Sequence, residues 1–275
     1  MALSNISLTA GMRANLFNMQ TTARLMDQTQ TRLSSGKRVN TALDDPINFF
    51  AAQGHTNRAS DLNLRKDGMG EAIQTIKAAD AGMKGITDLL AQAKSLITAA
   101  RTTTLTADAN ALENQYNSLL TQLDNLADDA GYKGINLLDG NNITIEFNEN
   151  SGSAGHSLTV TGFTADASTF AMTAAAANSW LTGSNLNAAE TSIDNAISTL
   201  RTKAQTLSNN LSIITTRQDF TQNMIDTLQK GADDLTLADM NEEGANMLML
   251  QTRQQLATTA LSLASQAAQS VLRLF

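Results

Sequence analysis

The side chains that could carry out chemistry are few in this chain of 275 residues. It has two histidines, His55 and His156, and no cysteine, which leaves no thiol for a nucleophile, a disulfide or a metal site. Neither histidine belongs to an H-E-x-x-H pattern, the arrangement that binds zinc in many metalloproteases. The residues therefore argue against a hydrolase centred on either histidine, and His55 is better explained as a surface or interface residue.

Paired acids are the other candidates, because two carboxylates can share a cation with a partner chain. They occur at 128–129, 233–234 and 242–243. All three pairs lie at predicted helix ends or linkers, where solvation or helix capping accounts for them better. Gly68 and Gly70 lack the strand, turn and helix of a phosphate-binding loop. The sequence predicts a protein that is not an enzyme, with no cofactor and no bound metal.

The composition favours long helices over a thick globular core. Aromatic residues make up 4% of the chain, which has one proline and one tryptophan. The net charge of −7 is unevenly placed, and at positions 1–40 only Asp27 opposes the basic residues Arg13, Arg24, Arg32, Lys37 and Arg38. No dense basic patch carries interleaved aromatic residues, so nucleic-acid binding is not predicted.

Membrane insertion is not predicted either. No window approaches the roughly 18 consecutive apolar residues that a membrane-spanning helix needs. The N-terminus lacks a basic region followed by an apolar one, so we expect any export to proceed without a cleaved signal peptide.

The helical elements can be placed by their periodicity and their start signals. We expect helices over about 5–34, 46–100, 107–129 and 187–230, with a linker at 35–45 and a break at 233–245. Asp45 and Pro46 form a good N-cap and first-turn pair for the second helix. Glycines inside that helix each cost about 1 kcal/mol relative to alanine in an exposed helix, so tertiary packing must stabilise it.

The periodicity changes after the third helix. Glycines and asparagines interrupt the chain, and Ile143, Ile145 and Phe147 alternate with polar residues, as do Leu158 and Val160. This alternation is typical of half-buried strands. We expect a small β-hairpin region with irregular loops between about 135 and 178.

Apolar stripes at both ends of the chain have the spacing of a coiled-coil seam, with alternating steps of three and four residues. The N-terminal stripe comprises Met12, Leu16, Met19, Ala23, Met26, Gln30 and Leu33. The C-terminal stripe comprises Met247, Leu250, Gln254, Ala257, Leu261, Ala264, Ala268, Val271 and Phe275. A second stripe on the C-terminal helix comprises Met249, Leu256, Ala260, Leu263, Ala267 and Leu274. We expect the terminal helices to pair along the seam, and the second stripe to need further partners.

The order of the elements folds the chain back on itself, so that the first helix pairs with the last and the second with the penultimate. The predicted fold class is mainly α: long antiparallel helices forming a coiled-coil rod, with paired N- and C-termini and a small β-hairpin insert. Residues 1–45 with 236–275 form the predicted inner polymerisation domain. Residues 46–134 with 180–235 form a helical-bundle domain, and 135–179 form an insert at the outer surface.

Several motifs in order resemble bacterial flagellin. Residues 32–40 (Arg-Leu-Ser-Ser-Gly-Lys-Arg-Val-Asn), followed by Ala42 and Asp44-Asp45, resemble the signature where the inner terminal helix meets the next domain. Residues 132–138 (Tyr-Lys-Gly-Ile-Asn-Leu-Leu) resemble the passage from helix to hairpin. Residues 239–243 and the ending at 266–275 resemble the family's C-terminal pattern. The resemblance covers about residues 1–140 and 187–275.

The resemblance implies a structural subunit of the flagellar filament, extracellular, that polymerises with many copies of itself for swimming. It also implies an export chaperone that shields the C-terminal seam, and contacts with cap and hook-junction proteins. Gln92 and Ser95 stand where many flagellins carry an arginine and a glutamate recognised by a toll-like innate receptor. Their presence counts against recognition by that receptor.

Two alternatives remain at the level of sequence. A hook–filament junction protein shares the terminal helices but assembles as one short ring, and the Leu-Ser-Ser-Gly motif with the complete ending favours the filament subunit over it. A non-flagellar secreted coiled-coil protein should be well folded at both ends as a monomer. For a flagellin-like subunit we instead expect poorly ordered ends until assembly, because an isolated two-helix seam buries little area.

Overall fold

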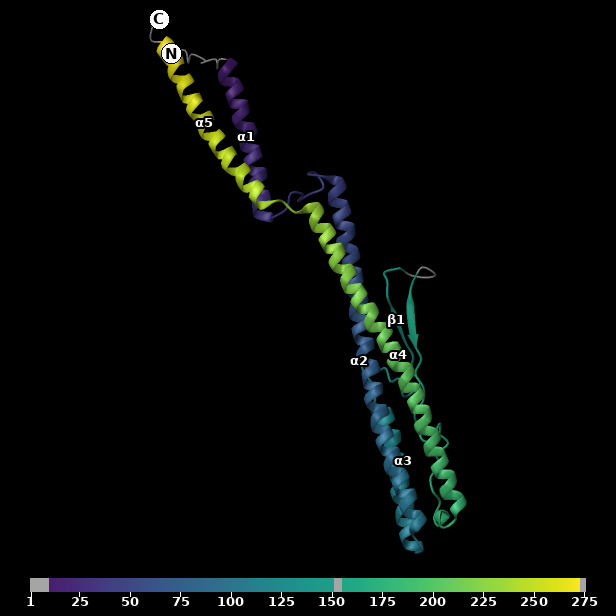
Figure 1. Ribbon diagram of the computed structural model, residues 1–275. Coiled ribbons are helices and arrows are strands. Elements are labelled where there is room, and N and C mark those ends of the chain that lie inside the picture. Colours follow the sequence, from purple (N-terminus) through teal and green to yellow (C-terminus); the bar gives the residue numbers. More distant parts are fainter. Residues whose placement is uncertain (1–9, 151–154, 273–275) are drawn as a thin grey trace, which may run out of the picture. The chain divides into compact units, whose positions relative to one another are not determined.

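The computed structural model describes residues 10–150 and 155–272, apart from the side chains at 268, 271 and 272. Helices dominate these residues, and the two strands form one small sheet (Figure 1). The helices are α1 (Ala10–Ser35), α2 (Pro46–Thr102), α3 (Thr106–Asp129), the 3-10 helix η2 (Ser179–Leu181), α4 (Gly183–Thr236) and α5 (Met240–Leu272). The strands are β1 (Ile143–Glu146) and β2 (Ser157–Val160). The predicted mainly helical fold with a small hairpin is confirmed.

Helix starts follow local capping. The Asp45 carboxylate accepts hydrogen bonds from the backbone amides of Ile47 and Asn48, both at 3.1 Å, so α2 begins at Pro46 as predicted. Asp239 caps α5 in the same way, with the Asn241 amide 2.8 Å from its carboxylate. Among the described residues, no helix is long and apolar enough to cross a membrane.

The chain divides into two compact units. Unit 1 comprises Met1–Asn57 with Thr227–Phe275, and unit 2 comprises Arg58–Asp226. The boundary falls inside the continuous helices α2 and α4. The three-part domain division expected from the sequence stays a prediction.

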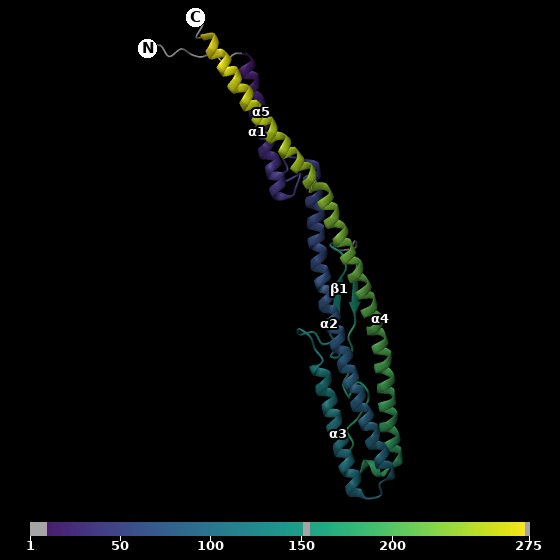
Figure 2. The ribbon, with the colours of Figure 1, turned by 60° about the vertical axis from the view of Figure 1, so that its left-hand side comes forward.

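The core of unit 2 lies among α2, α3 and α4, which run alongside one another (Figures 1 and 2). The penultimate helix α4 packs into this core, and its residues Ile193, Leu200 and Ile214 are each at most 2% exposed. The large buried side chains that α2 and α3 contribute include Met69, Ile76, Ile86, Leu90, Ile97, Tyr116 and Leu123.

Two of the glycines in α2 have a packing role. A Cβ on Gly82 would lie 2.6 Å from the Ala130 Cβ, and one on Gly85 would lie 2.7 Å from a methyl group of Leu126. These glycines therefore let α2 approach α3 and its C-terminal end closely. Gly54 and Gly68 have no atom within 4 Å of such a position, and no contact explains them.

Polar side chains on α3 hold the segment at 175–180, which leads into α4, by hydrogen bonds to its backbone. Glu113 is 2% exposed, and its carboxylate accepts hydrogen bonds from the backbone amides of Trp180 (2.7 Å) and Asn178 (3.0 Å). Asn117 exchanges two hydrogen bonds with the backbone of Ala175, at 2.7 and 2.9 Å. The Trp180 ring lies 5.1 Å from that of Tyr116, so these hydrogen bonds seat an aromatic pair against the core.

The hairpin pairs β1 with β2 in antiparallel register, with Ile145 opposite Leu158. Ion pairs link its acids to α2, Arg65 to Glu146 and Arg58 to Glu149, the latter at 2.6 Å. The Arg217 guanidinium of α4 lies 5.3 Å from the centre of the Phe147 ring. The predicted hairpin region is present, held to both long helices of unit 2.

The predicted break at 233–245 is wrong in its extent. Helix α4 continues to Thr236 and α5 begins at Met240, so only three residues separate them. The physical reason is a tertiary contact, because the Arg38 amide donates to the Thr236 carbonyl at 2.7 Å and the Ala238 amide donates to the Gly36 carbonyl at 3.0 Å. These bonds stabilise the short connection, which sequence periodicity cannot reveal.

Candidate assembly surface

In unit 1, α1 and α5 pack side by side and run antiparallel (Figures 1 and 2). At the end where α1 finishes and α5 begins, the Arg32 guanidinium lies 2.9 Å from the Glu243 carboxylate, which is largely buried. The backbone bonds between 36–39 and 236–238 lie at the same end. The prediction that the chain's two end helices pair is confirmed.

The seam residues predicted on α5 differ in burial. Leu250 is 4% exposed, whereas Ala257, Leu261 and Ala264 are partly exposed. The side chains of Ala268 and Val271, and all of Phe275, lie outside the described residues.

On α1 the observed stripe differs in part from the predicted one. Met12, Met19, Met26 and Leu33 are partly exposed, as expected for a seam that contacts a single helix. Leu16, at 40%, and Ala23 are exposed. Three less exposed positions between Met12 and Leu33 are polar: Asn15, Thr22 and Thr29. A seam pattern that alternates steps of three and four residues always includes Met12, Met19, Met26 and Leu33, but the position between them depends on which step comes first. The apolar choice of that position is Leu16 and Ala23, whereas the packed face holds the polar residues one position earlier, Asn15 and Thr22.

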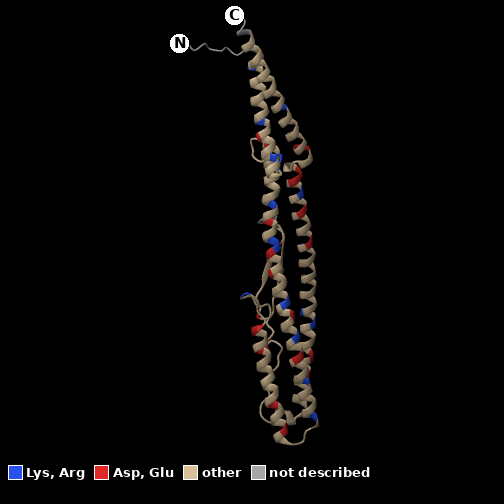
Figure 3. Cartoon of the chain, turned by 90° about the vertical axis from the view of Figure 1, so that its left-hand side faces the viewer, with Lys and Arg blue, Asp and Glu red and all other residues tan. Residues whose placement is uncertain are grey.

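The second stripe of α5 is exposed. Met249 is 45% exposed, Leu256 65% and Leu263 61%, and these residues lie seven positions apart on one face. Between Met247 and Leu272, Arg253 is the one charged residue in the sequence, and Figure 3 shows how sparse charge is along this helix. An apolar face of this length, with so little charge beside it, is typical of a protein interaction surface.

Further apolar side chains of unit 1 are exposed. On α1, Phe17 is 65% exposed. Leu43 (96%), in the linker before α2, and Ile47 (80%) and Phe50 (65%), in the first turns of α2, are also exposed. The Asp44 carboxylate accepts hydrogen bonds from the amides of Asn40 (3.0 Å) and Thr41 (2.9 Å), so this linker has a defined turn.

The chemical candidates from the sequence do not form a reaction centre. The His156 amide donates to the Asn148 side chain at 2.9 Å, and His55 lies on α2. No group of three or more potential metal ligands occurs in the described parts of the chain. Burial raises the pKa of the Tyr116 hydroxyl, which leaves it neutral at physiological pH.

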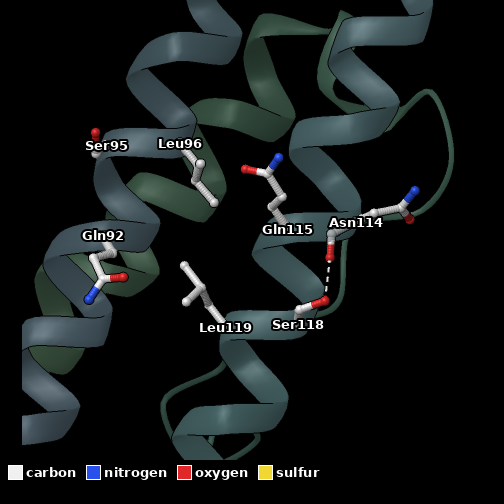
Figure 4. A pocket seen from close by; sticks show the side chains of 7 residues that line it. All are labelled: Gln92, Ser95, Leu96, Asn114, Gln115, Ser118 and Leu119. Atoms are coloured by element: carbon white, nitrogen blue, oxygen red, sulfur yellow. Dashed lines mark hydrogen bonds between the residues drawn. The ribbon is translucent and has the colours of Figure 1, made fainter.

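A hollow of about 560 Å³ lies between α2 and α3. Leu96 and Leu119 point into it from the two helices (Figure 4). The remaining lining residues are uncharged amides and hydroxyls: Gln92, Ser95, Asn114, Gln115 and Ser118. Such a neutral lining offers neither an acid nor a base for catalysis.

Comparison with known proteins decides the family. The model of the bacterial flagellin N-terminal helical region matches residues 6–143, and that of the C-terminal helical region matches residues 190–275. This chain belongs to the bacterial flagellin family. The two matched regions contain α1–α3 and most of α4 with all of α5, the elements that form both units.

Individual flagellins align over the whole chain. Flagellin FljM of Caulobacter vibrioides is 33% identical over 276 residues, covering 100% of both chains. Flagellin FljK of the same organism is 32% identical over 279 residues, again with complete coverage of both. The crystal structure of Bacillus cereus flagellin covers 56% of this chain and 88% of its own, with 20% identity and a TM-score of 0.48.

The protein is therefore a structural subunit of the bacterial flagellar filament. It assembles with copies of itself into an extracellular polymer, as predicted. It belongs to a family of structural proteins, so the prediction that it is not an enzyme is confirmed.

Proposed function

We propose that this flagellin polymerises chiefly through unit 1, with α1 and α5 paired inside each subunit and the second stripe of α5 packed on neighbouring copies. The observation that carries the proposal is the exposure of Met249, Leu256 and Leu263 on a helix that is almost free of charge. In this arrangement the partly or fully buried seam residues, such as Met19, Met26 and Leu250, form the intrasubunit contact, whereas the exposed seam residues Leu16 and Ala23 join the outward surface.

The energetics favour assembly over a stable isolated pair. Apolar burial contributes about 25 cal/mol per Å², and the α1 face toward α5 includes Asn15, Thr22 and Thr29, which add little. Ordering each residue costs roughly 1–2 kcal/mol of backbone entropy. Several neighbours that cover the second stripe supply burial that α1 alone does not.

The same surface suits the partners that handle a flagellin before and during assembly. An export chaperone would cover the apolar face of α5 until the subunit reaches the growing tip. Cap and hook-junction proteins would contact the subunits at the two ends of the polymer. Unit 2 would form the layer around the inner helices, with the hairpin region toward the outside.

Toll-like receptor recognition is proposed to be weak. Gln92 and Ser95 line the neutral hollow between α2 and α3, and none of its lining residues is charged. A receptor that forms ion pairs with an arginine and a glutamate at these two positions could form neither ion pair with Gln92 and Ser95.

Leu256→Asp tests the assembly role. The new charge faces solvent in the free subunit, so unit 2 should melt as in the wild type. In the polymer it would be buried without a partner, which costs several kcal/mol and should abolish filaments in electron micrographs and sedimentation assays.

Gln255→Asp is the matched control, since it adds the same charge one residue away without removing an apolar side chain. It should retain filaments with at most a modest rise in critical concentration. Normal filaments from Leu256→Asp would contradict the proposal, and so would equal loss in both variants.

A further inference from the structure

The methionines of this chain are distributed unequally between the two units. In unit 2, Met69, Met83 and Met172 are 0%, 3% and 4% exposed, and Met224 alone among its four is partly exposed. In unit 1, by contrast, Met240 and Met249 are 47% and 45% exposed. The other described methionines of that unit are all partly exposed: Met12, Met19, Met26 and Met247.

The accessible methionines coincide with the assembly surface. Met12, Met19 and Met26 lie seven residues apart on the α1 stripe that packs on α5. Met247 precedes Leu250 on the α5 seam, and Met249 begins the second stripe. Thioethers therefore lie on both the intrasubunit and the outward faces of the two helices.

We propose that these methionines form an oxidation site through which hydrogen peroxide prevents the free subunit from polymerising. The inference rests on the proposed role of unit 1 in assembly. Each thioether sulfur attacks one peroxide oxygen, forming an S–O bond as the O–O bond breaks. The sulfur loses two electrons, and the peroxide is reduced to water.

The product is incompatible with a packed helical interface. A sulfoxide is polar and accepts hydrogen bonds, whereas the original thioether is a flexible apolar group. Most residues of the two α5 stripes are apolar, including Leu250, Ala257 and Leu261, and Gln254 is the one polar side chain among them. Burying a polar sulfoxide oxygen among these apolar side chains disfavours assembly.

Protection should follow the state of assembly. In the free subunit the described methionines of unit 1 are exposed or partly exposed, and we expect a filament that packs α5 on its neighbours to cover them. Unit 2 should keep its fold in peroxide because three of its four methionines are buried. Oxidation would thus remove subunits from the pool that can assemble, without unfolding their core.

The test treats the free full-length subunit with hydrogen peroxide, removes the peroxide and seeds polymerisation. Peptide mass spectrometry should locate sulfoxides at Met19, Met26, Met247 and Met249, with an unchanged melting transition for unit 2. Elongation should slow roughly tenfold or more, because several polar oxygens enter one interface. Enzymatic reduction of the sulfoxides with a thiol reductant should restore the rate.

Two variants test whether oxidation of the α1 and α5 methionines, rather than oxidation elsewhere in the chain, slows elongation. A variant with leucine at all six methionines of α1 and α5 should elongate equally with and without peroxide treatment. Met224→Leu is the matched control for a partly exposed methionine of unit 2, and it should retain the peroxide sensitivity of the wild type.

The inference is overturned if the oxidised wild type elongates at the untreated rate, or if reduction of the sulfoxides restores nothing. Equal peroxide sensitivity in the six-leucine variant also overturns it. In each case the failure of Leu256→Asp to polymerise would show that unit 1 still drives assembly. Filaments from Leu256→Asp would instead mean that the proposed function itself has failed.

Discussion

Units 1 and 2 are both built from long helices, but they differ in how much of each helix is covered. In unit 2, α4 contributes one apolar stripe, and its residues Ile193, Leu200 and Ile214 are almost completely buried. In unit 1, α5 contributes two stripes, of which one contacts α1 while Leu256 and Leu263 of the other remain more than half exposed. All the described large side chains that are less than 2% exposed belong to unit 2. The number of apolar stripes on a helix thus indicates how many partners it needs, and α5 has more stripes than the single chain can cover.

Truncation of one leucine in each unit should separate the two kinds of burial. Leu90→Ala removes a side chain that is 0% exposed and should destabilise unit 2 by about 3 kcal/mol through the cavity it leaves. Leu263→Ala should leave the melting of the free subunit unchanged and raise the critical concentration for polymerisation roughly tenfold. Calorimetry of the subunit and sedimentation of the polymer measure the two effects. A fall in subunit stability from Leu263→Ala would mean that its face is already covered in the monomer.

The glycines of α2 allow a second contrast, within unit 2. Gly82→Ala places a methyl group 2.6 Å from the Ala130 Cβ, and the overpacking should destabilise the unit by about 2 kcal/mol. Gly68→Ala has no atom within 4 Å and should stabilise it by about 0.5–1 kcal/mol through helix propensity. Chemical denaturation of both variants measures the difference. Equal effects would show that α2 and α3 do not approach each other as closely as described.

The Asp44 turn is a part of unit 1 that should be ordered without neighbours. Hydrogen bonds from the amides of Thr41 and Asn40 lower the pKa of its carboxyl below the ordinary value of 3.8. Because the folded pKa is the lower one, the turn's contribution to stability is present above the ordinary pKa and is lost as the pH falls through the lowered pKa.

An NMR titration of the Asn40 and Thr41 amides in the free subunit should report that lowered pKa, and Asp44→Asn should abolish the titration. A pKa at or above 3.8 would contradict the turn geometry.

The helices could be predicted from the sequence because their apolar residues recur regularly. Asp45 with Pro46 marks the start of α2 in the sequence, and the structure has the helix begin there. The family could be identified from motifs along the chain. What could not be predicted depends on contacts between distant residues, such as the bonds from Arg38 and Ala238 that allow α4 to continue to Thr236.

Polar contributions to packing were also missed. Periodicity gives no reason to bury Glu113, whose carboxylate accepts hydrogen bonds from the backbone amides of Asn178 and Trp180, in a segment far along the chain. Apolar spacing places Leu16 and Ala23 on the packed face of α1, whereas the less exposed positions there hold Asn15, Thr22 and Thr29. Hydropathy alone cannot distinguish apolar residues that pack within the subunit from apolar residues that pack on neighbouring subunits.

Amide hydrogen exchange tests most directly whether unit 1 is completed by assembly. Exchange should be measured by mass spectrometry on the free subunit and on the filament under the same conditions. Peptides from α5 should exchange rapidly in the subunit and become strongly protected in the filament, whereas peptides covering 69–97 of α2 should be protected in both. Protection of α5 in the free subunit equal to that of 69–97, with no gain on polymerisation, would contradict this expectation.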